Sequence, residues 1–94
     1  MIHIGYCSIE LHFPSCHSLK DKRMILKGLK ERIKNRFNIA LAEEDHSDLW
    51  QRSRLGVVTL AQDKQTVMNT FDKILEQIEL NGAVQITDIQ KEYF

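Results

Sequence analysis

The chain has 94 residues, of which 43% are hydrophobic and one is proline. This length and composition predict one folded domain with a buried core, and they exclude a second core and a compositionally disordered chain. Thirteen Lys and Arg residues balance thirteen Asp and Glu residues. A net charge of zero excludes a uniformly basic nucleic-acid-binding protein, although it does not say where the charges lie.

Membrane and secretory signals are not found in the sequence. Charged residues interrupt every apolar stretch before it reaches the roughly 18 residues that a membrane-spanning helix needs. The segment from Met1 to Gly5 lacks the basic start and the long apolar run of a signal peptide. The chain has two cysteines, Cys7 and Cys16. These features predict a soluble cytoplasmic protein with reduced thiols and no membrane partner.

The first half of the chain contains the patterns of a strand, a helix and a second strand. Residues 2–13 alternate apolar and polar side chains, which is typical of a half-buried strand, and Pro14 ends it. Ser18 begins an S-x-x-D capping pattern, and apolar residues at helical spacing predict a helix of about 18 residues that ends near Asn38. Residues 39–44 predict the second strand.

The second half repeats this alternation of element types. Residues 54–62 predict a third strand, which a connection around residues 46–53 joins to the second. Asp63 or Thr66 is placed to cap a second helix, and Asn81-Gly82 would end it with residues that accept a left-handed backbone. The fourth strand is predicted at residues 84–89 or over a longer segment that continues toward the end of the chain.

The element order β-α-β-β-α-β is that of the ferredoxin-like fold. We therefore predict a single α+β domain over residues 1–94, in which both helices cover one face of a four-stranded antiparallel sheet. The second face of the sheet would be open, and its partly apolar character suits pairing with another protomer. Gly5 and Gly56, both inside predicted strands, indicate bulges or the close approach of a neighbouring backbone.

The charges of the chain are unevenly distributed. The segment from Lys20 to Arg36 carries +6, the residues before it carry −1, and those after it carry −5. Five of its cations follow spacings of three, four, three and four, so they form one stripe beside the apolar face of the helix. The first helical turn adds backbone N–H groups and the positive end of the helix dipole. The predicted anion-binding or nucleic-acid-binding residues are Lys20, Lys22, Arg23, Lys27, Lys30 and Lys34, unless the stripe serves only to solvate the helix.

An acidic segment between the second and third strands invites a metal interpretation. Its potential ligands are Glu43, Glu44, Asp45, His46 and Asp48. Their spacing matches no standard zinc or calcium motif, and neighbours in a strand point to opposite faces. We therefore predict no metal site, and we interpret the segment as an acidic edge that stays solvated or meets the basic helix of another copy.

Trp50 is the only tryptophan of the chain. It suits a core position, an interface or a surface on which a nucleobase stacks. Packing within the fold or between copies is the favoured interpretation. Tyr6 on the open sheet face and Trp50 are the two predicted protein-interface residues.

Cys16 and His17 stand just before the first helix, where the dipole and nearby cations would lower the thiol pKa. Adjacency in sequence does not make a catalytic pair, and no third residue that would orient them can be identified. No catalytic residue and no cofactor are predicted, and the protein is not expected to be an enzyme.

Several segments together resemble one known family. The Ser-Leu-Lys-x-Lys-Arg element at residues 18–23, with Trp50-Gln51 downstream, is its most specific part. The pattern resembles the YlxP-like family of small bacterial domains and covers essentially the whole chain. The resemblance implies a ferredoxin-like fold and an association with genes of translation and ribosome maturation, but no catalytic residue. The other segments that carry it are Gly5 with its strand, residues 38–43 and residues 55–57.

Three functions follow as hypotheses. The leading one is a non-enzymatic cytoplasmic binding module whose first helix contacts RNA or a ribosomal particle. The second is a homodimer or larger homo-oligomer that buries the open sheet face and Trp50 between copies. The third is thiol or metal chemistry at Cys16 and the acidic segment.

Overall fold

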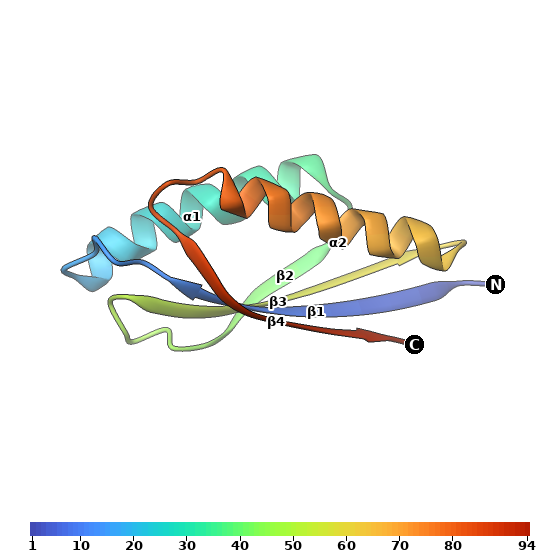
Figure 1. Ribbon diagram of the computed structural model, residues 1–94, viewed down its shortest axis with the longest axis horizontal. Helices are drawn as coiled ribbons and strands as arrows, with labels where there is room; N and C mark the ends of the chain where they lie inside the picture. The colour runs from blue at the N-terminus through green and yellow to red at the C-terminus, as the bar shows by residue number, and fades with distance from the viewer.

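The computed structural model describes residues 1–94 and has the predicted order of elements. The four strands form one antiparallel sheet in the order β2-β3-β1-β4. Figure 1 shows that both helices lie on one face of this sheet. The predicted ferredoxin-like α+β fold is thereby confirmed. The elements are β1 (His3–His12), α1 (Leu19–Arg36), β2 (Ala40–Asp45), β3 (Arg52–Ala61), α2 (Lys64–Glu79) and β4 (Gln85–Tyr93).

Both helices begin at predicted caps. The Ser18 hydroxyl accepts a hydrogen bond from the Asp21 N–H at 3.0 Å, and the Asp63 carboxylate accepts one from the Thr66 N–H at 2.8 Å. The Asp21 carboxylate in turn accepts from the His17 N–H at 3.3 Å. The reciprocal bonds at the start of α1 resemble a capping box, and they use the chain's own groups to satisfy part of the helix end. Neither helix combines the length and the apolar composition needed to cross a membrane.

The strand boundaries and the end of the first helix differ from the sequence prediction, most of them by one or two residues. β3 begins at Arg52 and β4 continues to Tyr93, because the ten residues of β1 offer hydrogen-bonding partners along both edges. The left-handed backbone expected at Asn81-Gly82 does not form, since no glycine has a positive φ. The one residue in the left-handed region is His46, with φ 64°, directly after β2.

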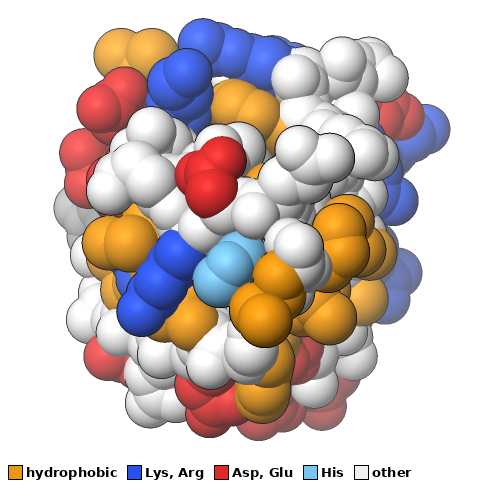
Figure 2. All heavy atoms as spheres, turned by 90° about the vertical axis from the view of Figure 1, so that its right-hand side faces the viewer, with side chains coloured by type: hydrophobic (Ala, Val, Ile, Leu, Met, Phe, Trp, Pro, Cys, Tyr) orange, Lys and Arg blue, Asp and Glu red, His pale blue; other side chains and the backbone are white.

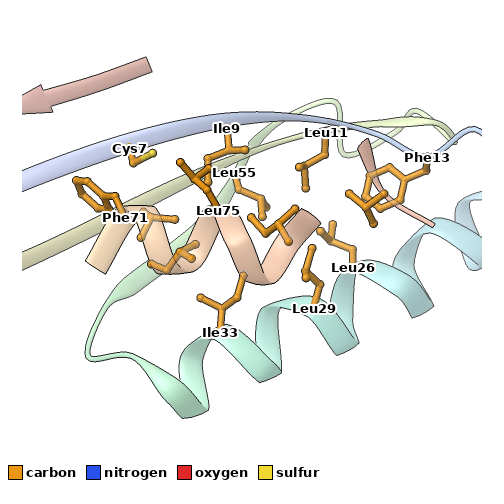
Figure 3. Packing of buried hydrophobic residues seen from close by; sticks show 14 of the residues in the cluster. Cys7, Ile9, Leu11, Phe13, Leu26, Leu29, Ile33, Leu55, Phe71 and Leu75 are labelled. Carbon is orange, nitrogen blue, oxygen red and sulfur yellow. The ribbon is translucent and has the colours of Figure 1, made fainter. Parts of the chain in front are cut away.

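The core lies between the sheet and the two helices. Figure 3 shows side chains of β1 and β3 pointing toward the apolar faces of α1 and α2. Sixteen buried residues form this cluster, including Cys7, whose inward position was predicted. Each large apolar side chain in such a core contributes about 1.5–3 kcal/mol by leaving water. The residues labelled in Figure 3 are Cys7, Ile9, Leu11, Phe13, Leu26, Leu29, Ile33, Leu55, Phe71 and Leu75.

Gly5 lies in β1 directly against α2. A Cβ atom at Gly5 would lie 2.4 Å from Val67 Cγ1 and 2.7 Å from a ring carbon of Phe71. The close approach expected from the sequence is real, but side chains of α2 make it rather than a neighbouring backbone. The absent side chain at Gly5 therefore lets α2 pack closely on the sheet.

We expect Gly5→Ala to lower the free energy of unfolding by about 1–3 kcal/mol, because Val67 and Phe71 are buried and cannot move aside. Gly28→Ala is the matched control, since the nearest atom to its Cβ position is Arg32 Nη1 at 3.8 Å. In the interior of α1 that change should stabilise the protein by about 1 kcal/mol. Urea unfolding followed by circular dichroism measures both, and equal effects would contradict the packing argument.

Candidate functional site

Two loops meet at the end of the molecule that lies opposite both chain termini (Figure 1). They are the β1–α1 loop and the β2–β3 loop. The Phe13 N–H donates to the Gln51 carbonyl at 2.8 Å. The Gln51 side-chain amide donates to the carbonyls of Pro14 at 3.2 Å and Cys16 at 3.0 Å. These bonds fix the two loops to one another, so this end of the fold has a defined shape.

Lys22 fastens α1 to the same β2–β3 loop. Its side chain is fully buried, and its Nζ donates to the carbonyls of His46 at 2.8 Å and Arg52 at 3.1 Å. Longer contacts reach the Ser47 carbonyl at 3.4 Å and Glu43 Oε2 at 3.3 Å. A buried ammonium is stable only with such partners, because it has lost its hydration. We call this arrangement the Lys22 clamp.

Burial removes Lys22 from the predicted anion-binding set, because its ammonium is enclosed by four oxygens and cannot reach an external phosphate. The sequence contained a signal for this placement. Lys22 stands four residues before Leu26 and seven before Leu29, so it lies on the apolar face of α1 and not in the row of surface cations.

The other five predicted cations form what we call the basic stripe: Lys20, Arg23, Lys27, Lys30 and Lys34. Four are exposed and Lys30 is half-buried. None of them forms an ion pair, since the basic residues in the ion pairs of the structure are Lys22, His46, Arg52, Arg54 and Lys91. The charge of the basic stripe is therefore not neutralised within the chain.

The basic stripe faces away from α2. Arg36 follows Lys34 by two residues, which is about 200° around the helix. The Arg36 guanidinium donates to the Gln77 side chain of α2 at 3.1 Å, and so marks the side of α1 that faces α2. The stripe thus lies on a side of α1 that α2 does not cover.

A shallow hollow of about 580 Å³ opens at the end where the two loops meet, and we call it the loop-end hollow. Trp50 lies in its wall with 55% of its surface exposed, so it is not a core residue. Half of the Arg52 side chain is exposed as well. The lining residues are His17, Asp48, Leu49, Trp50, Gln51 and Arg52.

The centre of the open sheet face is polar, and its charges are paired. Arg54 donates to Glu10 at 3.1 Å, to Asp88 at 3.2 Å and to the Ser8 hydroxyl at 2.7 Å. Arg52 lies 3.1 Å from the second carboxylate oxygen of Glu10. These contacts bury Ser8 and Glu10 although both project from the face that the helices leave open. We call these bonds the sheet-face network.

Glu44 extends this network across a neighbouring strand. It projects from β2, passes over β3 and accepts hydrogen bonds from the Ser8 hydroxyl at 2.8 Å and from the Tyr6 hydroxyl, both on β1. Gly56 of β3 gives it room, because a Cβ there would lie 2.7 Å from Glu44 Cδ. The bond to Glu44 raises the pKa of Tyr6. Tyr6 is therefore tied into the sheet and half exposed, and its role in a protein interface stays a prediction.

The structure gives Cys16 the opposite pKa shift from the one expected. Burial, assisted by the charge of Asp21, raises the pKa of its thiol and outweighs the lowering effect of Lys22. Burial likewise raises the pKa of Cys7 to about 11. A thiol that stays protonated at neutral pH is a poor nucleophile.

The acidic segment is divided between the two sheet faces. Glu43 points inward to the Lys22 clamp, whereas Glu44 lies on the open face. Asp45 accepts from the His46 N–H at 2.8 Å. No three His, Cys, Asp or Glu side chains come together in a way that would hold a metal ion.

Comparison with known proteins places the chain in a family. It matches the model of the family described as "Protein of unknown function (DUF503)" over residues 4–91, and it belongs to that family. It is also 28% identical over 91 residues to the uncharacterized protein YlxP of Bacillus subtilis (strain 168), covering 97% of this chain and 99% of that protein. The resemblance inferred from the sequence is confirmed.

Two solved structures are similar to the chain. The de novo designed protein Foldit4 has a TM-score of 0.54 and 16% identity, and the match covers 98% of this chain and 97% of that one. A dimeric ferredoxin-like protein from an uncultured marine organism has a TM-score of 0.46 and 10% identity, over 100% and 96% of the two chains. The likeness to the designed protein shows the fold alone.

We expect Lys22→Met to lower the free energy of unfolding by about 3–5 kcal/mol, because Glu43 and the loop carbonyls would lose the cation that they surround. Lys20→Met changes an exposed lysine in the same helical turn, and it should alter stability by no more than about 0.5 kcal/mol. Urea titrations of both variants provide the comparison. Similar small effects for the two lysines would show that the clamp contributes little.

Proposed function

We propose that the protein is a non-enzymatic binding module of the cytoplasm, which contacts RNA or a ribosomal particle through the basic stripe of α1. The observation that supports this most directly is that Lys20, Arg23, Lys27 and Lys34 are exposed and have no acidic partner within the chain. Association with a polyanion would release condensed counterions, and this release supplies most of the affinity for nucleic-acid backbones.

The dimensions of the basic stripe suit a phosphate backbone. From Lys20 to Lys34 it extends 14 residues along α1, or about 21 Å at 1.5 Å per residue. With Lys22 counted as internal, α1 still carries a net charge of +5. A protein of zero total charge thus has one face on which several successive phosphates can be neutralised.

The open sheet face is less suited to this role. Its arginines, Arg52 and Arg54, are already paired with Glu10 and Asp88. A phosphate would have to compete with these internal contacts, and three carboxylates nearby would repel it. The helix is therefore the better surface for a polyanion.

Two properties of the cysteines support the cytoplasmic and non-enzymatic parts of the proposal. Cys7 and Cys16 are both free and buried, as is common in proteins of reducing compartments. The raised pKa of Cys16 also argues against a thiolate nucleophile next to the helix.

Paired charge reversals would test the basic stripe against a matched control. We expect Lys27→Glu with Lys34→Glu on α1 to weaken binding of a labelled single-stranded oligoribonucleotide at least ~10-fold, and to reduce the slope of log affinity against log salt by about 1.4. Lys64→Glu with Lys73→Glu on α2 makes the same change in net charge and should have little effect on affinity or slope.

Fluorescence anisotropy over a range of salt concentrations measures both quantities. Equal losses in the two double variants would show only a general effect of net charge. If the wild-type protein binds neither the oligoribonucleotide nor isolated ribosomal particles at low salt, the proposed function is wrong.

We infer a second candidate function, homodimerisation, from the apolar end of the open sheet face. Ile4 and Leu60 are cross-strand partners with 40% and 58% of their surface exposed, and Val58 beside them is 40% exposed. Figure 2 looks at this end of the molecule and shows hydrophobic side chains gathered there. A contiguous apolar surface favours contact with another protein. Trp50 lies at the opposite end of β3, so the two parts of the predicted interface are not one patch.

Light scattering at increasing protein concentration tests this candidate. We expect the mass of a dimer for the wild-type chain and of a monomer for Leu60→Glu, because a charge in the contact would have to be buried. Leu80→Glu is the control, since Leu80 is 84% exposed at the end of α2, away from this face. A monomeric mass at every concentration would exclude the dimer.

A further inference from the structure

We propose that the loop-end hollow binds one unpaired nucleobase of a single-stranded RNA, with the base stacked on Trp50 and the adjoining phosphates on the basic stripe. This inference rests on the proposed function and deepens it, because it specifies which form of RNA is preferred. The hollow of about 580 Å³ falls within the usual range of ligand-binding sites, about 300–1,000 Å³.

The loop-end hollow is already formed in the protein without a ligand. Its two walls are the β1–α1 and β2–β3 loops, which Gln51 joins through bonds to Pro14 and Cys16. The Lys22 clamp fixes the second loop to α1 through the carbonyls of His46 and Arg52. A preformed site loses little conformational entropy when it binds, so modest contacts suffice for affinity.

Trp50 is exposed in a way that packing within the fold does not explain. Its surface is 55% exposed, and the structure assigns its indole no hydrogen bond and no stacking partner within the chain. Large aromatic rings left open beside polar groups are typical of binding surfaces. A nucleobase presents a flat face to such a ring, and stacking of this kind tolerates any base.

The rim that surrounds Trp50 is polar. His17, Asp48 and Arg52 line the same hollow and supply both donors and acceptors. The edges of an unpaired base carry both kinds of group, whereas a purely apolar segment would offer no partner to the side chains of His17 and Asp48. A base is therefore a better occupant than an aliphatic side chain of a protein.

The loop-end hollow lies next to the start of the basic stripe. His17 lines the hollow, and α1 begins two residues later with Lys20 and Arg23 in its first turns. A strand whose base enters the hollow can thus continue along α1 with its phosphates on the stripe. Bases inside an A-form duplex are stacked and paired, so a duplex can use the stripe but not the hollow.

Trp50 is the only tryptophan, so the tryptophan fluorescence of the protein reports directly on the surroundings of this side chain. We expect a single-stranded oligoribonucleotide to quench the tryptophan fluorescence of the wild-type protein, because a stacked base lies against the indole. An RNA duplex of the same sequence should bind with little quenching. Trp50→Leu should weaken single-strand binding about 10-fold and leave duplex binding and its salt dependence unchanged. Trp50→Phe keeps an aromatic ring and should retain most of the single-strand affinity.

Leu80→Ser is the matched control, because Leu80 is 84% exposed at the end of α2, outside the loop-end hollow, the basic stripe and the apolar end of the sheet, and it should not affect either RNA. Absence of quenching, or equal single-strand affinity for Trp50→Leu and the wild type, would overturn the inference while duplex binding through the stripe still supports the proposed function. Trp50→Leu with unchanged RNA affinity but altered self-association would instead assign Trp50 to a protein contact. Loss of binding only in the double variant of Lys27 and Lys34 would leave the stripe alone as the site.

Discussion

The end of the molecule where the two loops meet depends on the contacts of the buried Lys22 ammonium. Removing a charge from water is costly, and four oxygens must surround it to offset that cost. Those oxygens come from β2, from the β2–β3 loop and from the first residue of β3. The loop must therefore fold around the cation so that its carbonyls reach the ammonium. The helix that carries the basic stripe is thereby fixed to the loop that carries Trp50, and the two parts of the proposed RNA surface share one rigid support.

Local periodicity was sufficient to predict the order of elements and the caps. The alternation in β1 and the helical spacing of Leu26, Leu29 and Ile33 arise because each element buries one face. Such a pattern can be recognised within each element on its own. Lys22 was wrongly predicted to bind anions at the surface, because its charge was given more weight than its position on the apolar face of α1. The end of β4 at Tyr93 was left open by the sequence, since the length of β4 follows from β1 as a partner and not from its own largely exposed residues.

The site was harder to predict because its contacts join distant parts of the sequence. Gln51 meets Pro14 and Cys16 more than 30 positions away, and such contacts leave no trace in any window of the sequence. Trp50 could be named as a candidate, but its exposure depends on how two loops meet. The thiol of Cys16 shows the same limit, because helix-end electrostatics favoured a lower pKa and tertiary burial reversed the direction.

Glu44 has a consequence for how the strands align during folding. β2 and β1 are not neighbours, yet Glu44 joins them over Gly56, the one position of β3 in its path that has no side chain. A slip of β2 by one residue would turn Glu44 toward the apolar core and leave Ser8 and Tyr6 without their acceptor. The network therefore discriminates against misaligned sheets, and it gives this short edge strand a specificity that its few backbone hydrogen bonds and small alanines would not supply alone.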